Sequence, residues 1–231
     1  YGYLRVLINF MPDATNFFSP LVQTIAVVSL IYSSLATLRQ SDFKALVAYS
    51  SISHMAIVVL GLFSNTIVGI EGAILLSVAH GFISPALFTL VGGVLYDQRH
   101  TRIIRYYRGT VVYMPVFRLL FFLATIANMG IPLSLNWAGE FMSLAGTFQK
   151  NPVIGVLGAT GIVLSASYSI FLFNRIRFGS YSQYLPKLND VSRREFMVLF
   201  ALLLPAFILG ICPNVILNDL HMAVTDLLYT L

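Results

Sequence analysis

One carboxylate and two imidazoles lie inside stretches of the sequence that are otherwise apolar. Glu140 lies in a stretch from about Met114 to Phe148, and His54 and His80 lie in two earlier stretches. A charged residue at the centre of a bilayer costs about 2.5–3.5 kcal/mol on insertion scales, so such residues generally have a function. These three side chains are therefore candidates for moving an ion or a proton.

A short turn-like segment interrupts the stretch that contains Glu140. Residues 130–133 include Gly130 and Pro132, and proline kinks or breaks a helix. Irregular backbone at membrane depth occurs where it is buried in protein or lines a water-filled cavity, as in the broken helices of transporters. The sequence therefore predicts a broken membrane helix with Gly130 and Pro132 at its break.

Small polar side chains accompany each of the three candidate groups. Each lies three or four residues, or about one helical turn, from its candidate group, so it shares the same helix face. This pattern favours hydrogen-bonded water between the helices. The supporting residues are Ser50 and Ser51 before His54, Ser77 and Ser84 on either side of His80, and Asn136 and Ser143 on either side of Glu140.

Protons suit these groups better than other ions do. Histidine titrates near neutral pH, and a carboxyl group removed from water holds its proton more tightly, so the two could exchange protons through water. A sodium site would need several converging oxygens, often from unwound backbone. The predicted break could supply such oxygens, so the sequence leaves sodium open.

Each candidate also has a purely structural interpretation. A membrane histidine can hydrogen-bond across a helix interface, which explains His54 or His80 taken singly as well as proton transfer does. Glu140 could form a structural ion pair with a cation on another helix. Lys44 begins its apolar run, so it could anchor the helix at the membrane boundary or take part in proton transfer.

The composition predicts a polytopic membrane protein of the all-α class. Of the 231 residues, 58% are hydrophobic and only 10% are charged, whereas soluble domains carry about 25% charged residues. A bilayer-crossing helix needs about 20 apolar residues. We therefore expect a helix bundle with six spans, at Leu21–Leu38, Phe43–Leu62, Ile67–Leu95, Val116–Phe148 (broken), Val153–Phe173 and Phe196–Cys212.

Several residues are expected to define helix ends. Pro20 suits the first turn of the first span. Ser41 or Asp42 can cap the second, with Asp42 favoured, and Glu71 is favoured by the helix dipole at the start of the third. Residues 215–228 have the spacing of an amphipathic helix, which lies in the interface or ends the last span. His221 is expected to be interfacial.

Lysine and arginine residues are concentrated on one side of this map. Because spans reverse direction, alternate connections share a side, and the basic side faces the cytoplasm, or the matrix in a mitochondrion. Arg118 lies close to that boundary, and only Lys150 and Arg5 fall elsewhere. The basic side holds Arg39, Lys44, Arg99, Arg102, Arg105, Arg108, Arg175, Arg177, Lys187, Arg193 and Arg194.

Other functions lack a sequence signal. Residues 99–108 are basic and aromatic, but between two spans they favour contact with anionic lipid or an acidic partner over nucleic-acid binding. Cys212 is the only cysteine, so no thiolate metal cluster is expected, and we predict no metal site. No phosphate-binding glycine loop or catalytic triad is found.

Residues 1–10 resemble the end of a helix already under way, so we expect the chain to be the C-terminal part of a longer protein or one piece of a split protein. The predicted organisation has three parts. They are residues 1–18 (end of a preceding span and a loop), residues 19–178 (a repeat of five membrane helices, broken at about 116–148) and residues 179–231 (a basic loop, the last span and an amphipathic tail).

Several motifs together resemble the antiporter-like subunits of respiratory complex I, the proton-pumping NADH:ubiquinone oxidoreductase. Residues 39–55 (RQSDFKALVAYSSISHM) resemble the signature of these subunits. Five other segments and the end of the last span are similar to the subunit 4 type. These are AHG at 79–81, LYD at 95–97, HTR at 100–102, NMGIP at 128–132, GEF at 139–141 and GICP at 210–213.

The resemblance implies an inverted repeat of membrane helices, the second of two, with one broken helix. It implies that His54, His80 and Glu140 transfer protons during quinone reduction, with Lys44 at a basic position beside them. NADH, flavin, iron–sulfur clusters and ubiquinone would be bound by other subunits, so no cofactor is expected in this chain. The family's first-half glutamate–lysine pair is absent from this sequence.

The implied partners are other membrane-arm subunits, a polypeptide that supplies the missing N-terminal half, and lipids such as cardiolipin. The implied location is the mitochondrial inner membrane, with the basic loops on the matrix side. Two other functions stay open from the sequence. The chain could belong to a multisubunit cation/proton antiporter, or it could be a structural subunit whose polar residues only hold helices together.

Overall fold

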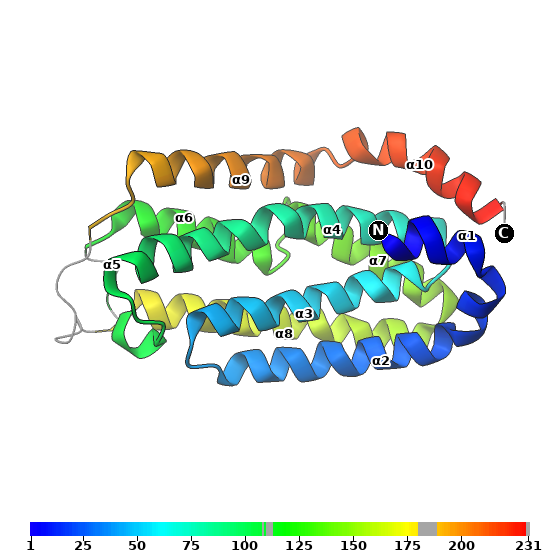
Figure 1. The fold of residues 1–231 in the computed structure, drawn as a ribbon, viewed down its shortest axis with the longest axis horizontal. Coiled ribbons are helices and arrows are strands. Elements are labelled where there is room, and N and C mark those ends of the chain that lie inside the picture. The colour runs from blue at the N-terminus through cyan, green and yellow to red at the C-terminus, as the bar shows by residue number, and fades with distance from the viewer. Residues whose placement is uncertain (108, 110–112, 180–188, 230–231) are drawn as a thin grey trace.

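The computed structural model describes residues 1–107, 109, 113–179 and 189–229, and these form a bundle of helices that run along one long axis (Figure 1). Two of the basic residues named above, Arg108 and Lys187, lie outside the described residues. Five described helices are long and apolar enough to cross a membrane, as the composition predicted. They are α2 (Pro12–Arg39), α3 (Phe43–Leu62), α4 (Ile67–Phe88, continuing to Arg99), α8 (Pro152–Arg177) and α9 (Arg193–Ile211).

The predicted broken span is confirmed. Helices α6 (Pro115–Asn128) and α7 (Leu135–Lys150) follow each other along the bundle axis (Figure 1). Between them the chain turns through two residues with positive φ angles, Gly130 at 71° and Leu133 at 83°. The side chain of Ser134 then accepts a hydrogen bond from the N–H of Trp137 and caps α7.

Helix α7 has its polar side inward and its apolar side outward. Asn136, Glu140 and Ser143 are at most 1% exposed, whereas Trp137 and Phe141 are 39% and 60% exposed. A soluble helix would show the opposite arrangement. In a membrane, polar side chains avoid lipid by facing other helices, so this orientation fits the bilayer as solvent.

The third span is longer and less regular than predicted. After α4 the chain continues as a π-helix, η2 (Thr89–Tyr96), and ends in the short α5 (Asp97–Arg99). Pro85 cannot donate a backbone N–H, and two glycines within η2 have low helix propensity, so this region is weakly held in the α-helical form.

The beginning of the chain differs from our expectation. Helix α2 begins at Pro12, so most of the connection predicted before the first span is helical. Proline suits the first helical position because that N–H needs no partner. Our placement of Pro20 in the first turn was therefore wrong, since it lies inside α2. The π-helix η1 (Tyr3–Leu7) and α1 (Ile8–Phe10) precede this helix.

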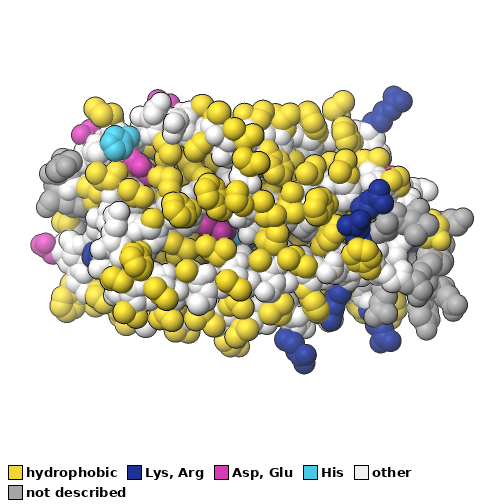
Figure 2. All heavy atoms as spheres, turned by 180° about the vertical axis from the view of Figure 1, so that it is seen from behind, with side chains coloured by type: hydrophobic (Ala, Val, Ile, Leu, Met, Phe, Trp, Pro, Cys, Tyr) yellow, Lys and Arg dark blue, Asp and Glu magenta, His cyan; other side chains and the backbone are white. Residues whose placement is uncertain are grey.

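The two ends of the bundle differ in charge. Helix α10 (Asn214–Tyr229) and the N-terminal α1 lie at one end, while the 3-10 helix η3 (Ile104–Tyr107) and α5 lie at the other (Figure 1). Figure 2 shows lysine and arginine side chains gathered toward one end of a largely apolar surface. The described connections thus cluster their basic residues as the sequence map predicted.

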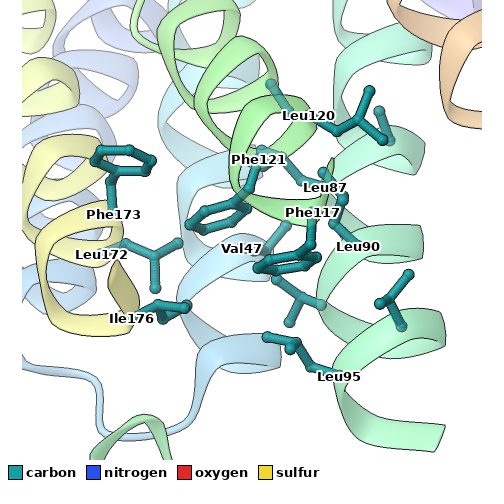
Figure 3. Packing of buried hydrophobic residues seen from close by; sticks show 14 of the residues in the cluster. Val47, Leu87, Leu90, Leu95, Phe117, Leu120, Phe121, Leu172, Phe173 and Ile176 are labelled. Carbon is teal, nitrogen blue, oxygen red and sulfur yellow. The ribbon is translucent and has the colours of Figure 1, made fainter. Parts of the chain in front are cut away.

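A hydrophobic cluster holds the basic half of the bundle together. Figure 3 shows side chains from four segments that are distant in sequence meeting in one layer, with Phe117 and Phe121 of α6 stacked at 5.4 Å between ring centroids. Because lipid is as apolar as these side chains, close packing rather than exclusion of water stabilises them. Labelled members are Val47, Leu87, Leu90, Leu95, Phe117, Leu120, Phe121, Leu172, Phe173 and Ile176.

Helix α4 lies close to both α7 and α3 because glycines at these contacts lie against the backbone of the neighbouring helix. A methyl group built on Gly139 would lie 2.6 Å from the backbone nitrogen of Leu76, and one on Gly61 of α3 would lie 2.7 Å from the carbonyl oxygen of Gly69. Small residues allow such contacts between membrane helices. This approach fixes where the buried face of α7 lies relative to α3 and α4.

We predict that Gly139→Ala destabilises the full-length protein by about 1–3 kcal/mol, because the added methyl group must push α4 and α7 apart. Thermal unfolding of the purified protein would measure this. Gly81→Ala is the matched control, since Gly81 of α4 has no atom within 4 Å of an added Cβ. Equal melting temperatures for the two variants would contradict the close-contact interpretation.

We also predict that Gly130→Ala destabilises the break by about 1–2 kcal/mol, because a side chain is disfavoured in the left-handed region. The same thermal measurement applies. Gly93→Ala serves as the control, since its Cβ would meet only the Thr89 methyl group at 3.8 Å. A Gly130 variant as stable as the Gly93 variant would show that the break does not require glycine.

Candidate functional site

Glu140 and His54 meet in the interior of the bundle. The carboxylate oxygen Oε1 of Glu140, on α7, lies 3.0 Å from Nδ1 of His54, on α3. Both residues are only 1% exposed. His54 shares the buried face of α3 with Ser50 and Ile57, which lie about one turn before and after it. The two residues therefore form a hydrogen-bonded pair that is shielded from the surroundings.

His80 brings a second imidazole to this pair from α4. Its ring centroid lies 5.6 Å from that of His54, and its Nε2 lies 2.8 Å from the hydroxyl of Ser51. Its Nδ1 is buried and has no hydrogen-bond partner in the described part of the protein. The structure therefore gathers Glu140, His54 and His80, which are far apart in sequence, into one cluster.

The residues at the break reach the same cluster. A methyl group built on Gly130 would lie 2.6 Å from Oε2 of Glu140, so the carboxylate occupies the space beside this glycine. A larger residue at this position would clash with the carboxylate as well as strain the turn. The helix break and the buried carboxylate thus belong to one site.

Tyr168 is part of the site, and our sequence analysis missed it. Its hydroxyl lies 3.4 Å from Nε2 of His54 and 3.1 Å from Oγ of Ser53, and the side chain is fully buried in α8. One signal was available, because Ser165, Ser167 and Ser169 surround this tyrosine in an otherwise apolar span. His54 therefore has polar partners on both ring nitrogens.

The supporting serines contribute less than their spacing suggested. Ser51 contacts His80 rather than His54, and Ser50 donates to the carbonyl of Val47 on its own helix. Ser77 likewise donates to a carbonyl one turn back, and Ser84 has no side-chain hydrogen bond to the described residues. Membrane serines often satisfy themselves on their own helix in this way, which spacing alone does not reveal.

Asn136 and Ser143 are buried on the same face of α7 as Glu140. Both amide atoms of Asn136 and the hydroxyl of Ser143 lack a hydrogen-bond partner among the described residues. Buried polar groups nearly always have a protein or water partner. These atoms therefore suit internal water beside Glu140.

Lys44 lies apart from the cluster. Its ammonium group lies 4.2 Å from the centroid of the Tyr96 ring, and it approaches the π-helix η2 at Gly92. At 1.5 Å per residue, Lys44 and His54 are separated by about 15 Å along α3. The contact with Tyr96 is a cation–π interaction near the basic end of the bundle.

A second carboxylate–imidazole pair joins the C-terminal helix to the bundle. Nδ1 of His221 on α10 lies 2.7 Å from Oε1 of Glu71 on α4. We had expected Glu71 to be favoured by the helix dipole and His221 to be interfacial. The expectation for Glu71 was wrong, because the first turn of α4 contains no acidic residue, and the pairing of the two residues was not predicted. No local pattern could reveal the pair, because 150 residues separate its members.

No group of three or more His, Cys, Asp and Glu side chains that could hold a metal ion occurs within the ranges described. The site consists of carboxylate, imidazole and hydroxyl groups supplied by α3, α4, α7 and α8. All of these groups can donate or accept hydrogen bonds.

The chain matches a known family over most of its length. Residues 1–165 match the model described as NADH:quinone oxidoreductase/Mrp antiporter, TM. The chain is 67% identical over 230 residues to NADH-ubiquinone oxidoreductase chain 4 of Mycosarcoma maydis, and 47% identical over 224 residues to that of Metridium senile. It covers 100% and 97% of itself in these matches but only 48% and 45% of the relatives, so it spans about half their length.

Solved structures agree with this assignment. A chain of respiratory complex I from Thermus thermophilus with bound NADH superposes with a TM-score of 0.93 at 26% identity, covering 99% of this chain and 48% of that one. A chain of the Mrp complex from Dietzia sp. gives 0.83 at 13% identity over 94% and 48%, which shows the shared fold alone. The chain belongs to the NADH:quinone oxidoreductase/Mrp antiporter transmembrane family.

Proposed function

We propose that this chain forms part of a proton-translocation pathway in the membrane arm of an NADH:ubiquinone oxidoreductase, coupled to quinone reduction. The observation that carries the proposal is the 3.0 Å contact between Glu140 and His54, with both side chains 1% exposed. A carboxylate and an imidazole in contact can exchange a proton without moving a charge through lipid.

The cluster offers a connected set of proton-binding groups. We assign the central role to Glu140, with His54 as its direct partner and His80 as the next group, 5.6 Å away between ring centroids. Asn136 and Ser143 would hold water beside the carboxylate. Lys44 lies outside the cluster, near the basic end of the bundle. From there it could deliver protons or anchor α3.

The remaining parts of the machinery would be supplied by other polypeptides. NADH, flavin, iron–sulfur clusters and ubiquinone would be bound elsewhere in the complex, and another stretch of polypeptide would supply the first antiporter-like repeat. Residues 1–18, 19–178 and 179–231 would serve as the entry segment, the second repeat and the closing span with its tail. The proposed location is the mitochondrial inner membrane, with the basic end in the matrix.

A cation/proton antiporter is the second candidate, because the family model that matches residues 1–165 also includes Mrp antiporters. It would show sodium-dependent transport without electron flow from NADH. A structural, non-conducting subunit is the third candidate. In that case the complex would pump normally after replacement of Glu140, His54 and His80. The matches to NADH-ubiquinone oxidoreductase chain 4 at 67% and 47% identity favour the redox-coupled function over both.

Glu140→Gln tests the proposal in the complete complex. We expect proton transport through this subunit to fall about tenfold or more, because glutamine keeps the shape but cannot release a proton. The measurement is the number of protons pumped per NADH oxidised in vesicles, with assembly checked by native electrophoresis. Glu71→Gln is the control, since Glu71 is also a buried glutamate (6% exposed) but pairs with His221 instead. Unchanged pumping in an assembled Glu140→Gln complex would refute the assigned role.

We also propose that anionic phospholipid, such as cardiolipin, binds at the basic end of the bundle. A cavity of about 650 Å³ opens between α8 and η3. Arg105 and Arg175 line it together with apolar side chains that include Phe171, whose ring centroid lies 3.9 Å from the Arg175 guanidinium. Two cations beside an apolar wall suit a phosphate headgroup and its acyl chain.

The double substitution Arg105→Gln and Arg175→Gln should weaken cardiolipin binding about tenfold or more, because each basic residue near the surface contributes about 1 kcal/mol. The measurement is thermal stabilisation of the delipidated complex by added cardiolipin, compared with phosphatidylcholine. Arg193→Gln with Arg194→Gln is the control, since these exposed arginines at the start of α9 do not line the cavity. Equal losses in the two double variants would indicate general charge attraction and would contradict a defined site.

A further inference from the structure

We propose that Tyr168 is a positioning residue whose hydroxyl group changes its hydrogen-bond partner when His54 gains or loses a proton. This inference rests on the proposed function of the Glu140–His54 pair. It assigns to α8 a part in the site that neither the family match nor the sequence motifs indicate. The contacts that carry it are those of the Tyr168 hydroxyl with His54 at 3.4 Å and with Ser53 at 3.1 Å.

The hydroxyl of Ser53 is available to Tyr168 as an acceptor. Ser53 donates its own proton to the carbonyl of Ser50, at 2.7 Å, which leaves its oxygen lone pairs free to accept. Tyr168 has a single hydroxyl proton and two possible acceptors, Ser53 Oγ and His54 Nε2. Which of them receives that proton depends on the charge of the imidazole.

When Glu140 is ionised and His54 is neutral, the hydroxyl of Tyr168 is the donor. An ionised Glu140 only accepts hydrogen bonds, so Nδ1 of His54 must carry the ring proton and donate it to Oε1. Nε2 then has a lone pair, and Tyr168 donates to it. The tyrosine thereby favours the tautomer in which the proton faces Glu140.

In the imidazolium form the direction reverses. Both ring nitrogens of His54 are then donors, so Nε2–H donates to the Tyr168 oxygen and the tyrosine proton turns to Ser53. Every polar atom in this row keeps a partner in both charge states. A buried donor without an acceptor costs free energy. Because the Tyr168 hydroxyl can accept from or donate to Nε2, it reduces the free-energy difference between the neutral and imidazolium forms of His54.

The proton balance of the step is simple. A hydronium ion of the internal water proposed beside this site gives a proton to Nε2 and becomes neutral water, which converts neutral His54 into the imidazolium. Transfer of the Nδ1 proton to the Glu140 carboxylate then leaves a neutral imidazole and a neutral carboxylic acid. Tyr168 itself starts and ends with its phenol proton, so it positions His54 and is not consumed.

The other titratable groups near His54 do not contact Nε2, so they cannot replace Tyr168 in this role. Glu140 from α7 holds Nδ1, and His80 from α4 approaches ring to ring at 5.6 Å. Tyr168 from α8 is the described partner of Nε2. These three groups are the titratable side chains that the structure shows in contact with His54 from the elements packed around α3.

Tyr168→Phe in the complete complex tests the role. The ring is retained and only the hydroxyl is lost, so we expect proton pumping to fall about tenfold near neutral pH, with assembly intact. Lowering the pH should restore part of the loss, because a higher proton concentration compensates for the missing acceptor of the imidazolium. The measurements are protons pumped per NADH oxidised and their dependence on pH.

Tyr107→Phe is the matched control. Tyr107 is also a buried tyrosine, 1% exposed, and its hydroxyl donates to the carbonyls of Leu95 and Thr101 at the basic end. Burial raises the pKa of Tyr107 to about 12, against the opposing charge of Arg99, so it stays a neutral phenol. Its loss should lower stability but leave pumping per NADH and its pH profile unchanged.

Ser53→Ala provides a second variant that keeps the tyrosine. It removes the acceptor that Tyr168 uses whenever Nε2 carries a proton, so pumping should fall in the same direction as in Tyr168→Phe but by less. If Glu140→Gln stops pumping while both Tyr168→Phe and Ser53→Ala behave like Tyr107→Phe, the positioning role is overturned and the proposed function stands. If Glu140→Gln pumps normally, the proposed function itself fails.

Discussion

The rest of the site depends on one constraint, which is that a carboxylate removed from water must have a partner. Glu140 is 1% exposed, and its desolvation would cost several kcal/mol if it were ionised and unpaired. His54 supplies that partner at 3.0 Å. Because imidazole can be neutral or charged, the pair can hold one proton in more than one place, which a pair with arginine could not do.

The surrounding backbone is arranged to bring these two side chains together. Glycines at the contact of α7 with α4 let the helices approach until side chains on α3 and α7 can touch. The left-handed turn at Gly130 leaves space for the Glu140 carboxylate beside the break. The break between α6 and α7 and the glycines of α7 thus both contribute to the contact between Glu140 and His54. Larger residues at these glycines would push α7 away from its neighbours.

The sequence was sufficient for features that depend on local chemistry. The apolar runs predicted the membrane helices, Asp42 predicted the start of α3, and Gly130 with Pro132 predicted the broken helix, because each depends on residues adjacent in the chain. Tyr168 and the Glu71–His221 pair were missed because they depend on which helix faces which. A polar residue in a span signals that it has a partner, but the identity of the partner follows from packing.

The two carboxylate–imidazole pairs have the same chemical groups but differ in how far the protein encloses them. In the Glu71–His221 pair the histidine side chain is 58% exposed, so the described residues do not enclose this pair. In the Glu140–His54 pair both side chains are at most 2% exposed, and their described neighbours include His80 and Tyr168. Under the proposed function, this enclosure makes the order of proton transfers depend on the protein, as coupling to a distant reaction requires.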